Sequence, residues 1–453
     1  MKRLIETLKN IWHIEDLRKR ILYSIGLIFI FRLGSYVILP GIDADLYKQA
    51  VEGGASGGLL GLINLFAGGG FSRASVFALG IMPYISASIA MQLLTIAVPS
   101  FARLQKEGES GRRKINQYTR WLTVVVTAFQ ASGYYIYLKS LSEGNGGIDF
   151  IVTSNGMFWF ICMIILTTGT LFTMWLGEKI TDRGVGNGIS FLIMVGIIAS
   201  LPASLINEFT SRVNENAGGL VPFVLELGFL VVVVMGCILL VQGTRRIPVQ
   251  YAKRVVGTRQ YGGNRQFIPL KINAAGVMPI IFAQALMFIP GTVQQFFPDS
   301  QSNFIMQLND FTSVTYNIIY GFLVIIFTYF YTAITINPTQ IADDLKKNGG
   351  FVPGVKPGKK TAEFIDNVLS RITLPGSIFL ALVAIMPVFT TAFGVGSQFA
   401  RFFGGTSLLI MVGVILDTLQ QIESHLLMRH YDGLMKSGRI KGRSSGAQTP
   451  VGM

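Results

Sequence analysis

Long apolar stretches repeat along the chain and dominate its pattern of hydrophobic and polar positions. Ten of them are near the length of about 20 residues that a helix needs to cross the hydrocarbon core of a bilayer. They lie at 21–39, 75–97, 117–138, 156–176, 188–206, 219–242, 272–290, 317–336, 372–393 and 405–422. A water-soluble protein would not repeat such segments so often. The pattern therefore predicts an all-α polytopic membrane protein with ten transmembrane helices.

The charged residues lie mainly between these stretches and follow a regular alternation. Nearly all of the 38 Lys and Arg residues fall in the N-terminal segment, in every second connection and in the C-terminal tail. Because cytosolic loops carry the excess of Lys and Arg in membrane proteins, the alternation predicts that both termini are cytosolic. This topology signal accounts for much of the net charge of +14. Contacts with anionic lipid or with a nucleic-acid-bearing partner need separate support.

Ten spans also divide into two groups of five, and an odd number of spans inverts the second group relative to the first. This arithmetic is typical of inverted repeats, which place the working site between the halves. We therefore predict a cytosolic N-terminal segment (1–20), a first half (21–206), a second half (207–435) and a basic tail (436–453). The sequence shows no clear internal repeat, so the spacing alone supports this division.

Two of the basic connections are unusually long, at 243–271 and 337–371. Alternating positions and the pair Gly262-Gly263 in the first predict a projecting β-hairpin. The second is expected to contain a helix from Pro338 to Lys347 and a glycine- and proline-rich tip. Their length favours a docking surface over plain linkers.

A further helix is expected after this tip. Thr361 is its predicted N-cap, with Phe364 and Val368 on one face.

The segment 52–74 interrupts the membrane pattern. A short apolar run, Leu59 to Phe66, is bracketed by glycines and is too short to span a bilayer. It fits a re-entrant element buried in protein, and it fits equally well an amphipathic helix at the outer interface.

Apart from Arg120 near the start of its span, the charged residues inside the spans are few, namely Arg32, Glu226 and Asp417. Structural roles are favoured for all three, because isolated charges in separate spans are a thin basis for a proton relay. Neither Cys162 nor Cys237 stands in a metal-ligand spacing, and no catalytic set, metal site or cofactor motif can be named. The run at 184–188 (GVGNG) lacks the lysine and the preceding strand of a phosphate loop.

Composition agrees with a membrane protein, since only 14% of residues are charged. An enzyme is disfavoured, and a secondary transporter for a small solute remains the alternative to a channel.

Several segments together resemble one family. They are FRLGSYVILPGID (31–43), SRASVFALGIMPYISASIAMQLL (72–94), KEGESGRRKINQYTR (106–120), GEKITDRGVGNGISF (177–191), RRIPVQYAKR (245–254), ADDLKKNGGFVPGVKPG (342–358) and FGGTSLLI (403–410). These motifs are similar to those of the SecY family, pore subunits of the bacterial protein-conducting channel. The resemblance runs from about residue 20 to 440.

The resemblance implies a clamshell of two five-helix halves with a narrow aliphatic ring and a movable plug. The ring maps onto Ile81, Ile85, Ile189, Ile193, Ile281 and Ile410. The plug maps onto 59–70, with apolar residues Leu59, Leu60, Leu62, Ile63, Leu65 and Phe66. An apolar ring can exclude water and ions when empty, and it can yield around any peptide because apolar contact is not directional. Without the resemblance, isoleucines in a membrane helix would be expected to pack or to face lipid.

The resemblance also implies a lateral gate and a set of partners. Gln92, Gln130 and Asn273 are expected to form a polar latch between spans 2 and 3 and spans 7 and 8. Arg245, Arg246, Lys253, Arg254 and Lys356 are expected to dock the ribosome and the SecA motor. Lys356 stands where the family usually has Arg, and Lys lacks the planar fork that pairs two oxygens.

The remaining expected partners are the small membrane subunits SecE and SecG, signal peptides, nascent chains and anionic lipid, with the chain in the bacterial plasma membrane and energy supplied by the partners.

Overall fold

The computed structural model describes residues 14–52, 64, 66–144, 149–214, 219–251, 254–256, 259–261, 265–296, 304, 307–308, 310 and 312–436. Within this part of the chain, every predicted span overlaps with one helix. The ten helices are α2 (Glu15–Gly34), α5 (Met82–Ala97), α7 (Glu109–Gly144), α8 (Asn155–Arg183), α9 (Gly188–Asn214), α10 (Leu220–Gln242), α11 (Met278–Phe296), α13 (Val314–Thr335), α15 (Lys359–Ala392) and α17 (Gly405–Lys436).

Six described helices are each long and apolar enough to cross a membrane, namely α8, α9, α10, α13, α15 and α17. A seventh apolar stretch consists of α5 and the following α6 (Pro99–Lys106), which are bent by 102° relative to each other. Val98 between them is extended, and Pro99 cannot donate the backbone hydrogen bond that would continue α5. The apolar part of α11 is shorter, at Met278–Met287.

Two predicted spans begin too early. Residues 75–81 form turns, and α5 starts only at Met82, because Gly80 has a positive φ of 53° and Pro83 favours the first helical turn. Residues 272–277 are likewise turns that include Gly276 at φ 64°, so α11 starts at Met278. Hydropathy alone could not locate these boundaries.

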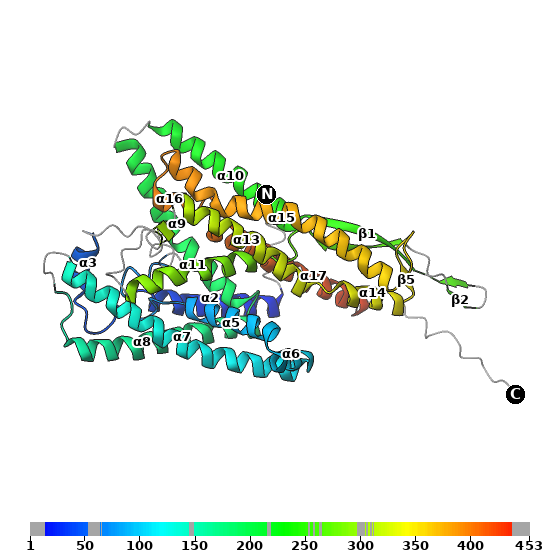
Figure 1. The fold of residues 1–453 in the computed structure, drawn as a ribbon, viewed down its shortest axis with the longest axis horizontal. Coiled ribbons are helices and arrows are strands. Elements are labelled where there is room, and N and C mark those ends of the chain that lie inside the picture. Colours follow the sequence, from blue (N-terminus) through cyan, green and yellow to red (C-terminus); the bar gives the residue numbers. More distant parts are fainter. Residues whose placement is uncertain are drawn as a thin grey trace.

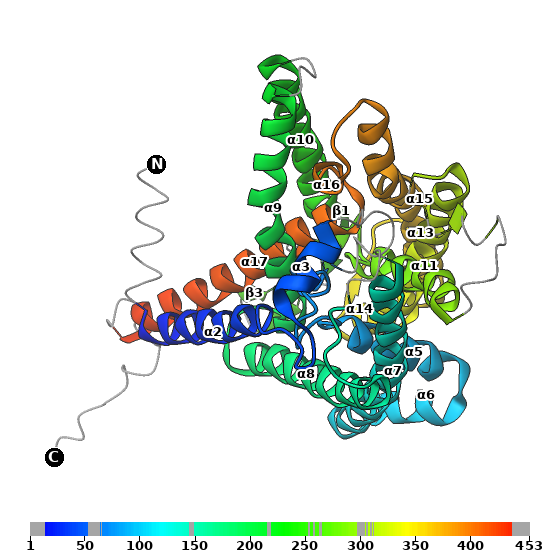
Figure 2. The same cartoon turned by 90° about the vertical axis from the view of Figure 1, so that its left-hand side faces the viewer.

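The helices form two groups that meet along two seams (Figures 1 and 2). In the first group α2, α5, α7, α8 and α9 contact one another, and in the second α10, α11, α13, α15 and α17 do. Along one seam α9 contacts α10, α17 and the short α16 (Ser397–Ala400). Along the other, α11 contacts α5 and α7. The largest apolar cluster takes residues from both groups and lies between them.

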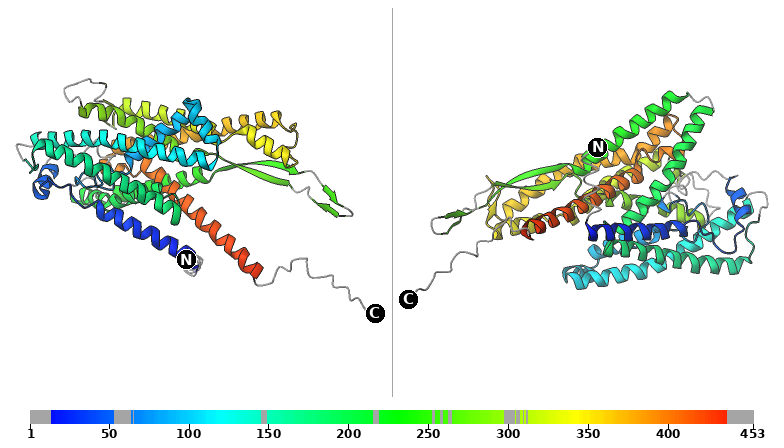
Figure 3. Two further views of the ribbon diagram at one scale, coloured as in Figure 1. Left: turned by 90° about the horizontal axis from the view of Figure 1, so that it is seen from below. Right: turned by 180° about the vertical axis from the view of Figure 1, so that it is seen from behind.

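The two long basic connections fold together into one module, which projects from one end of the bundle (Figures 1 and 3). We call this end the hairpin end. Strands β1 (Thr244–Tyr251) and β4 (Arg265–Lys271) pair antiparallel, and β1 also pairs with β5 (Gly350–Phe351). Helix α14 (Pro338–Lys347) packs beside them, and α3 (Ala44–Glu52) lies at the opposite end, the α3 end.

Apolar side chains from both connections form the core of this module. On β1, Ile247 and Val249 are buried while their neighbours are exposed, which is the alternation expected for a strand. They pack with Leu345 of α14 and with Ile365 and Leu369 of α15. The hairpin and the α14 prediction are therefore right, and the packing of the two connections against each other is new.

One local prediction in this module is wrong, and another lies outside the described residues. Strands β2 (Arg254–Val256) and β3 (Arg259–Tyr261) pair antiparallel. The predicted turn at Gly262-Gly263 lies outside the described residues. Helix α15 begins at Lys359 after Gly358, which has φ 96°.

The Thr361 hydroxyl is therefore not an N-cap but donates to the Lys356 carbonyl at 2.9 Å. The buried face of α15 contains Ile365 and Leu369, and Phe364 is exposed.

Candidate functional site

The six isoleucines of the predicted ring lie together in the middle of the bundle. Ile81, Ile193 and Ile410 are nearly fully buried in one apolar cluster, and Ile85, Ile189 and Ile281 are half-buried against it. We call these six residues the waist. Ile81 caps α5 and Ile85 lies one turn further, while Ile189 and Ile193 occupy successive turns of α9. The second group contributes Ile281 from α11 and Ile410 from α17, so both seams meet here.

The waist is closed. A cavity of about 10 Å³ lies between Ile85, Ile193, Ile281 and Ile410, which is room for about one water molecule. No charged side chain lines this cavity, and the Ser86 hydroxyl beside it already donates to the Met82 carbonyl at 3.2 Å. Apart from Ser86 and Gln284 the lining is apolar, so a space of this size has room for few polar contacts.

Phe66 closes the cavity from the α3 end. Its side chain is 5% exposed and lines the same space as the four isoleucines. Of the predicted plug residues, Leu59, Leu60, Leu62, Ile63 and Leu65 lie outside the described residues. We call residues 66–70 the stem.

The chain turns sharply along the stem, since Gly68 and Gly69 have φ of 63° and 86°, a region that favours glycine. Asn64 fastens the turn, because its carbonyl and side-chain oxygens accept from the Gly69 and Ser72 amides at 2.8 and 2.9 Å.

A larger pocket of about 400 Å³ opens on the seam between α5, α7, α11 and α13. Gln92 lines it together with Asn116, Thr119, Phe282 and Tyr331. Gln130 is half-buried on α7 and does not line this pocket.

Asn273 precedes α11, and its side-chain nitrogen donates to the Gly276 carbonyl at 3.0 Å. Within the described part of the chain, Gln92, Gln130 and Asn273 are not hydrogen-bonded to one another, so the predicted latch is not closed by direct bonds here.

The predicted docking residues lie on the hairpin-end module. Arg245 and Arg246 are exposed on β1, and Lys356 is exposed between β5 and α15. Lys253 is outside the described residues, and only the backbone of Arg254 is described, at the start of β2. One rigid module therefore carries cations from both connections.

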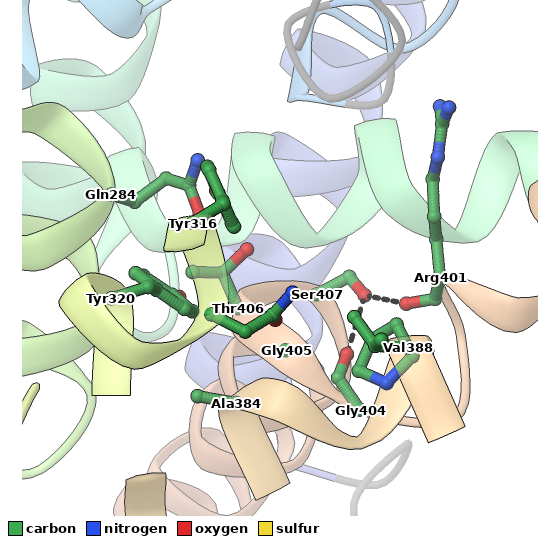
Figure 4. Close-up of a pocket in the computed structure, with 12 residues that line it drawn as sticks. Gln284, Tyr316, Tyr320, Ala384, Val388, Arg401, Gly404, Gly405, Thr406 and Ser407 are labelled. Atoms are coloured by element: carbon green, nitrogen blue, oxygen red, sulfur yellow. Dashed lines mark hydrogen bonds between the residues drawn. The ribbon is translucent and has the colours of Figure 1, made fainter. Parts of the chain in front are cut away.

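Gln284 is a site residue that the sequence reasoning missed. It is 4% exposed and lines both the waist cavity and a second, polar pocket of about 40 Å³ (Figure 4). Tyr316, Tyr320, Thr406 and Ser407 also line this second pocket. Ser407 donates to the Arg401 and Gly404 carbonyls at 2.6 and 3.3 Å.

The Gln284 Nε2 atom is buried without a hydrogen-bond partner among the described residues. A signal was available in the sequence, because Gln284 lies three residues after Ile281 and so shares its helix face.

The three ionisable residues of the spans have different surroundings. Arg32 donates to the Gly68 carbonyl at 2.9 Å. Glu226 forms an ion pair with Arg212, whose Nη2 lies 2.5 Å from its Oε1. Asp417 is exposed on α17. Arg32 and Glu226 thus make polar contacts within the bundle.

The run at 184–188 is also used structurally, since the amides of Val185, Gly186 and Gly188 donate to the side chains of Ser24, Gln421 and Thr181.

These features define a class of protein: a polytopic membrane protein whose two helical groups enclose an aliphatic constriction. A sequence model of the SecY family matches residues 75–419. The chain is 45% identical over 433 residues to the protein translocase subunit SecY of Streptomyces coelicolor, which covers 93% of this chain and 97% of the relative. The chain belongs to the SecY family. It is the pore-forming subunit of a protein-conducting channel, and it is not an enzyme.

Solved structures share the fold. One is a SecY channel in which the plug domain is described as stabilising the closed state and maintaining a membrane seal; it has a TM-score of 0.57, 14% identity and 95% coverage of both chains. Another is an idle yeast Ssh1 complex bound to the yeast 80S ribosome, with a TM-score of 0.58, 14% identity and coverage of 96% of this chain and 94% of that one. At this identity they establish the fold alone.

Proposed function

We propose that the waist is the constriction through which an unfolded polypeptide passes. The observation that carries this proposal is the position of all six isoleucines, which come from both helical groups and pack in one apolar cluster. Four of them, Ile85, Ile193, Ile281 and Ile410, line a cavity of about 10 Å³. Such a ring resists ions by excluding water, and it can widen around a peptide without specific recognition. The alternative, a transporter for a small solute, predicts a polar midplane site, and an apolar waist gives it no support.

The segment 59–70 is proposed as the plug that closes the waist from the α3 end. Phe66 supports this role, because it is the plug residue whose described side chain lines the waist cavity. The glycine turn of the stem supports it further, because a segment that must move aside needs a hinge of permissive backbone.

The seam between α5 and α7 on one side and α11 and α13 on the other is proposed as the lateral gate (Figure 2). Transmembrane segments would leave for lipid along this route. The groups are covalently joined at the opposite seam, where α10 follows α9, so separation is easiest where α11 meets α5 and α7.

The pocket of about 400 Å³ on this seam has apolar, aromatic and amide linings, which suit the apolar helix of a signal peptide with some polar backbone. Gln92 lines this pocket, whereas Gln130 and Asn273 do not.

The hairpin-end module is proposed to be cytosolic and to dock the ribosome and SecA through Arg245, Arg246, Lys253, Arg254 and Lys356. Exposed cations on a rigid module suit ribosomal phosphates. SecE and SecG are the proposed membrane subunits. The bacterial plasma membrane is the proposed location, with anionic lipid near the basic loops.

The test is crosslinking of a stalled secretory chain to single cysteines placed at Ile85 and Ile193. The native Cys162 and Cys237, both buried, are first replaced by Ala. Leu239 on α10, which is 71% exposed on the outside of the bundle, receives the control cysteine. Adducts at the waist positions with none at the control are expected. A stalled chain that is bound to the complex and yet forms no adduct at either isoleucine would exclude the waist as the pore.

A further inference from the structure

Arg32 connects the first helix of the bundle to the stem. It lies on α2, within an apolar stretch where a charge needs an acceptor. Its Nη1 donates to the carbonyl oxygen of Gly68 at 2.9 Å. Gly68 follows Phe66 by two residues, so this bond holds the backbone immediately beside the side chain that closes the waist.

The space around Gly68 is too tight for any other residue. A Cβ atom at Gly68 would lie 2.6 Å from Arg32 Nη1 and 3.1 Å from the Cα of Gly196 on α9. A Cβ atom at Gly196 would in turn lie 2.9 Å from the Phe66 carbonyl oxygen. The stem thus lies in a glycine-lined slot between α2 and α9, and Gly196 is less than one helical turn from Ile193 of the waist.

The chain just after the stem is held by the turn that follows α2. Tyr36 lies two residues past the end of α2, and the Arg73 guanidinium carbon lies 4.2 Å from the centre of its ring. The guanidinium of Arg32 lies 5.6 Å from the same ring. The C-terminal end of α2 and the turn after it therefore contact the chain both at Gly68 and at Arg73.

We infer that Arg32 is a positioning residue that keeps Phe66 in the waist of the empty channel by bonding to Gly68. This inference rests on the proposed function of the waist as the pore. The contact suits a reversible latch, because it is one side-chain bond to a backbone carbonyl and can break without rearranging α2. We call it the stem latch. Its loss removes a hydrogen bond from a charged donor, which favours displacement of the stem by about tenfold or more.

The test is the ion conductance of the purified complex in planar bilayers without any substrate. Arg32→Leu is expected to raise the open probability by about tenfold or more, and Arg32→Lys, which keeps a donor, is expected to lie between it and the unmodified channel. Lys19→Gln is the matched control, since it removes an exposed cation from the same helix far from the stem. It should leave the conductance unchanged.

Two further variants keep the inference testable. Gly196→Ala should raise the open probability as Arg32→Leu does, because the added carbon would clash with the Phe66 carbonyl oxygen. It replaces Arg32→Leu in the test if that variant does not fold. Phe66→Ala should leak although the stem latch stays intact, because it removes the side chain that closes the waist cavity. A tight Arg32→Leu channel beside a leaking Phe66→Ala channel would overturn the stem latch alone. A tight Phe66→Ala channel would overturn both the latch and the closure by Phe66. Neither result bears on crosslinking at Ile85 and Ile193, which tests the pore itself.

Discussion

If the waist is the pore, as we propose, a single apolar side chain in it should determine whether the empty channel is sealed. Ile193 is 3% exposed and borders a cavity of about 10 Å³, so its outer methyl groups fill the space that would otherwise hold water. An aliphatic side chain seals here without a polar partner, and the seal therefore depends on volume more than on chemical identity.

Ile193→Ala should make the empty channel leak. Removing the branched side chain enlarges the cavity enough to admit several waters, and it costs about 2–5 kcal/mol of packing free energy in a well-packed core. Ile198→Ala on the same helix is the control, because that side chain is 39% exposed on the bundle surface. Conductance and thermal unfolding of both variants test the point. Equal conductance of the two would show that Ile193 does not seal the pore.

A second prediction at the residue scale concerns water in the pocket beside Gln284. Its buried Nε2 and the Tyr320 hydroxyl have no partner among the described residues, and the pocket that they share measures about 40 Å³. That volume holds about two or three waters. A high-resolution electron cryomicroscopy map should show ordered waters bonded to Gln284, and Gln284→Leu should remove them. A dry pocket in the unmodified protein would contradict this.

The hairpin-end module shows what can and cannot be predicted at the scale of elements. The alternation of Ile247 and Val249 and the Pro338 start of α14 predicted a strand and a helix correctly. The packing of Leu345 in one cluster with Ile247 could not be predicted, because the two residues lie almost 100 positions apart in the chain. The prediction of Thr361 as N-cap was wrong because α15 begins at Lys359, with Gly358 at the N-cap position.

The double variant Arg245→Gln, Arg246→Gln should weaken ribosome binding. Both side chains are exposed, so the change leaves the module folded. Each lost phosphate contact lowers the slope of log affinity against log salt by about 0.7–0.9, so losing two contacts should lower the slope by about 1.4–1.8. Cosedimentation with ribosomes over a range of salt concentrations measures it. Lys139→Gln, near the α3 end, is the control and should keep the full slope. An unchanged slope in the double variant would remove these arginines from the docking surface.

At the scale of the whole molecule, the two groups need one seam that opens and one that holds. The ten spans were predictable from hydropathy, and the waist from family motifs together with i, i+4 spacing. The contacts of the seam at α9 and α10 could not be predicted from the sequence, because they join these two helices to the loop between α15 and α16. Here Arg212 donates to Glu208 at 3.1 Å, to Glu226 at 2.5 Å and to the Gly394 carbonyl at 2.6 Å. Glu208 also accepts from the Gly396 amide at 3.0 Å.

This charged cluster joins α9, α10 and the loop after α15 on the side opposite the proposed gate, and Arg212→Leu should therefore destabilise the whole bundle. The Arg212 and Glu226 side chains are each 11% exposed and that of Glu208 is 5% exposed, so removing the cation leaves two carboxylates buried without it, at a cost of about 3–5 kcal/mol. Arg113→Leu is the matched control, because its pair with Glu109 is 80% exposed on both sides and is worth about 1 kcal/mol or less. Thermal unfolding in detergent should separate the two variants by several degrees.

Adding Glu208→Gln and Glu226→Gln to Arg212→Leu should restore part of the lost stability, since no buried charge then remains. If Arg212→Leu unfolds at the same temperature as Arg113→Leu, the α9–α10 seam is held by apolar packing alone.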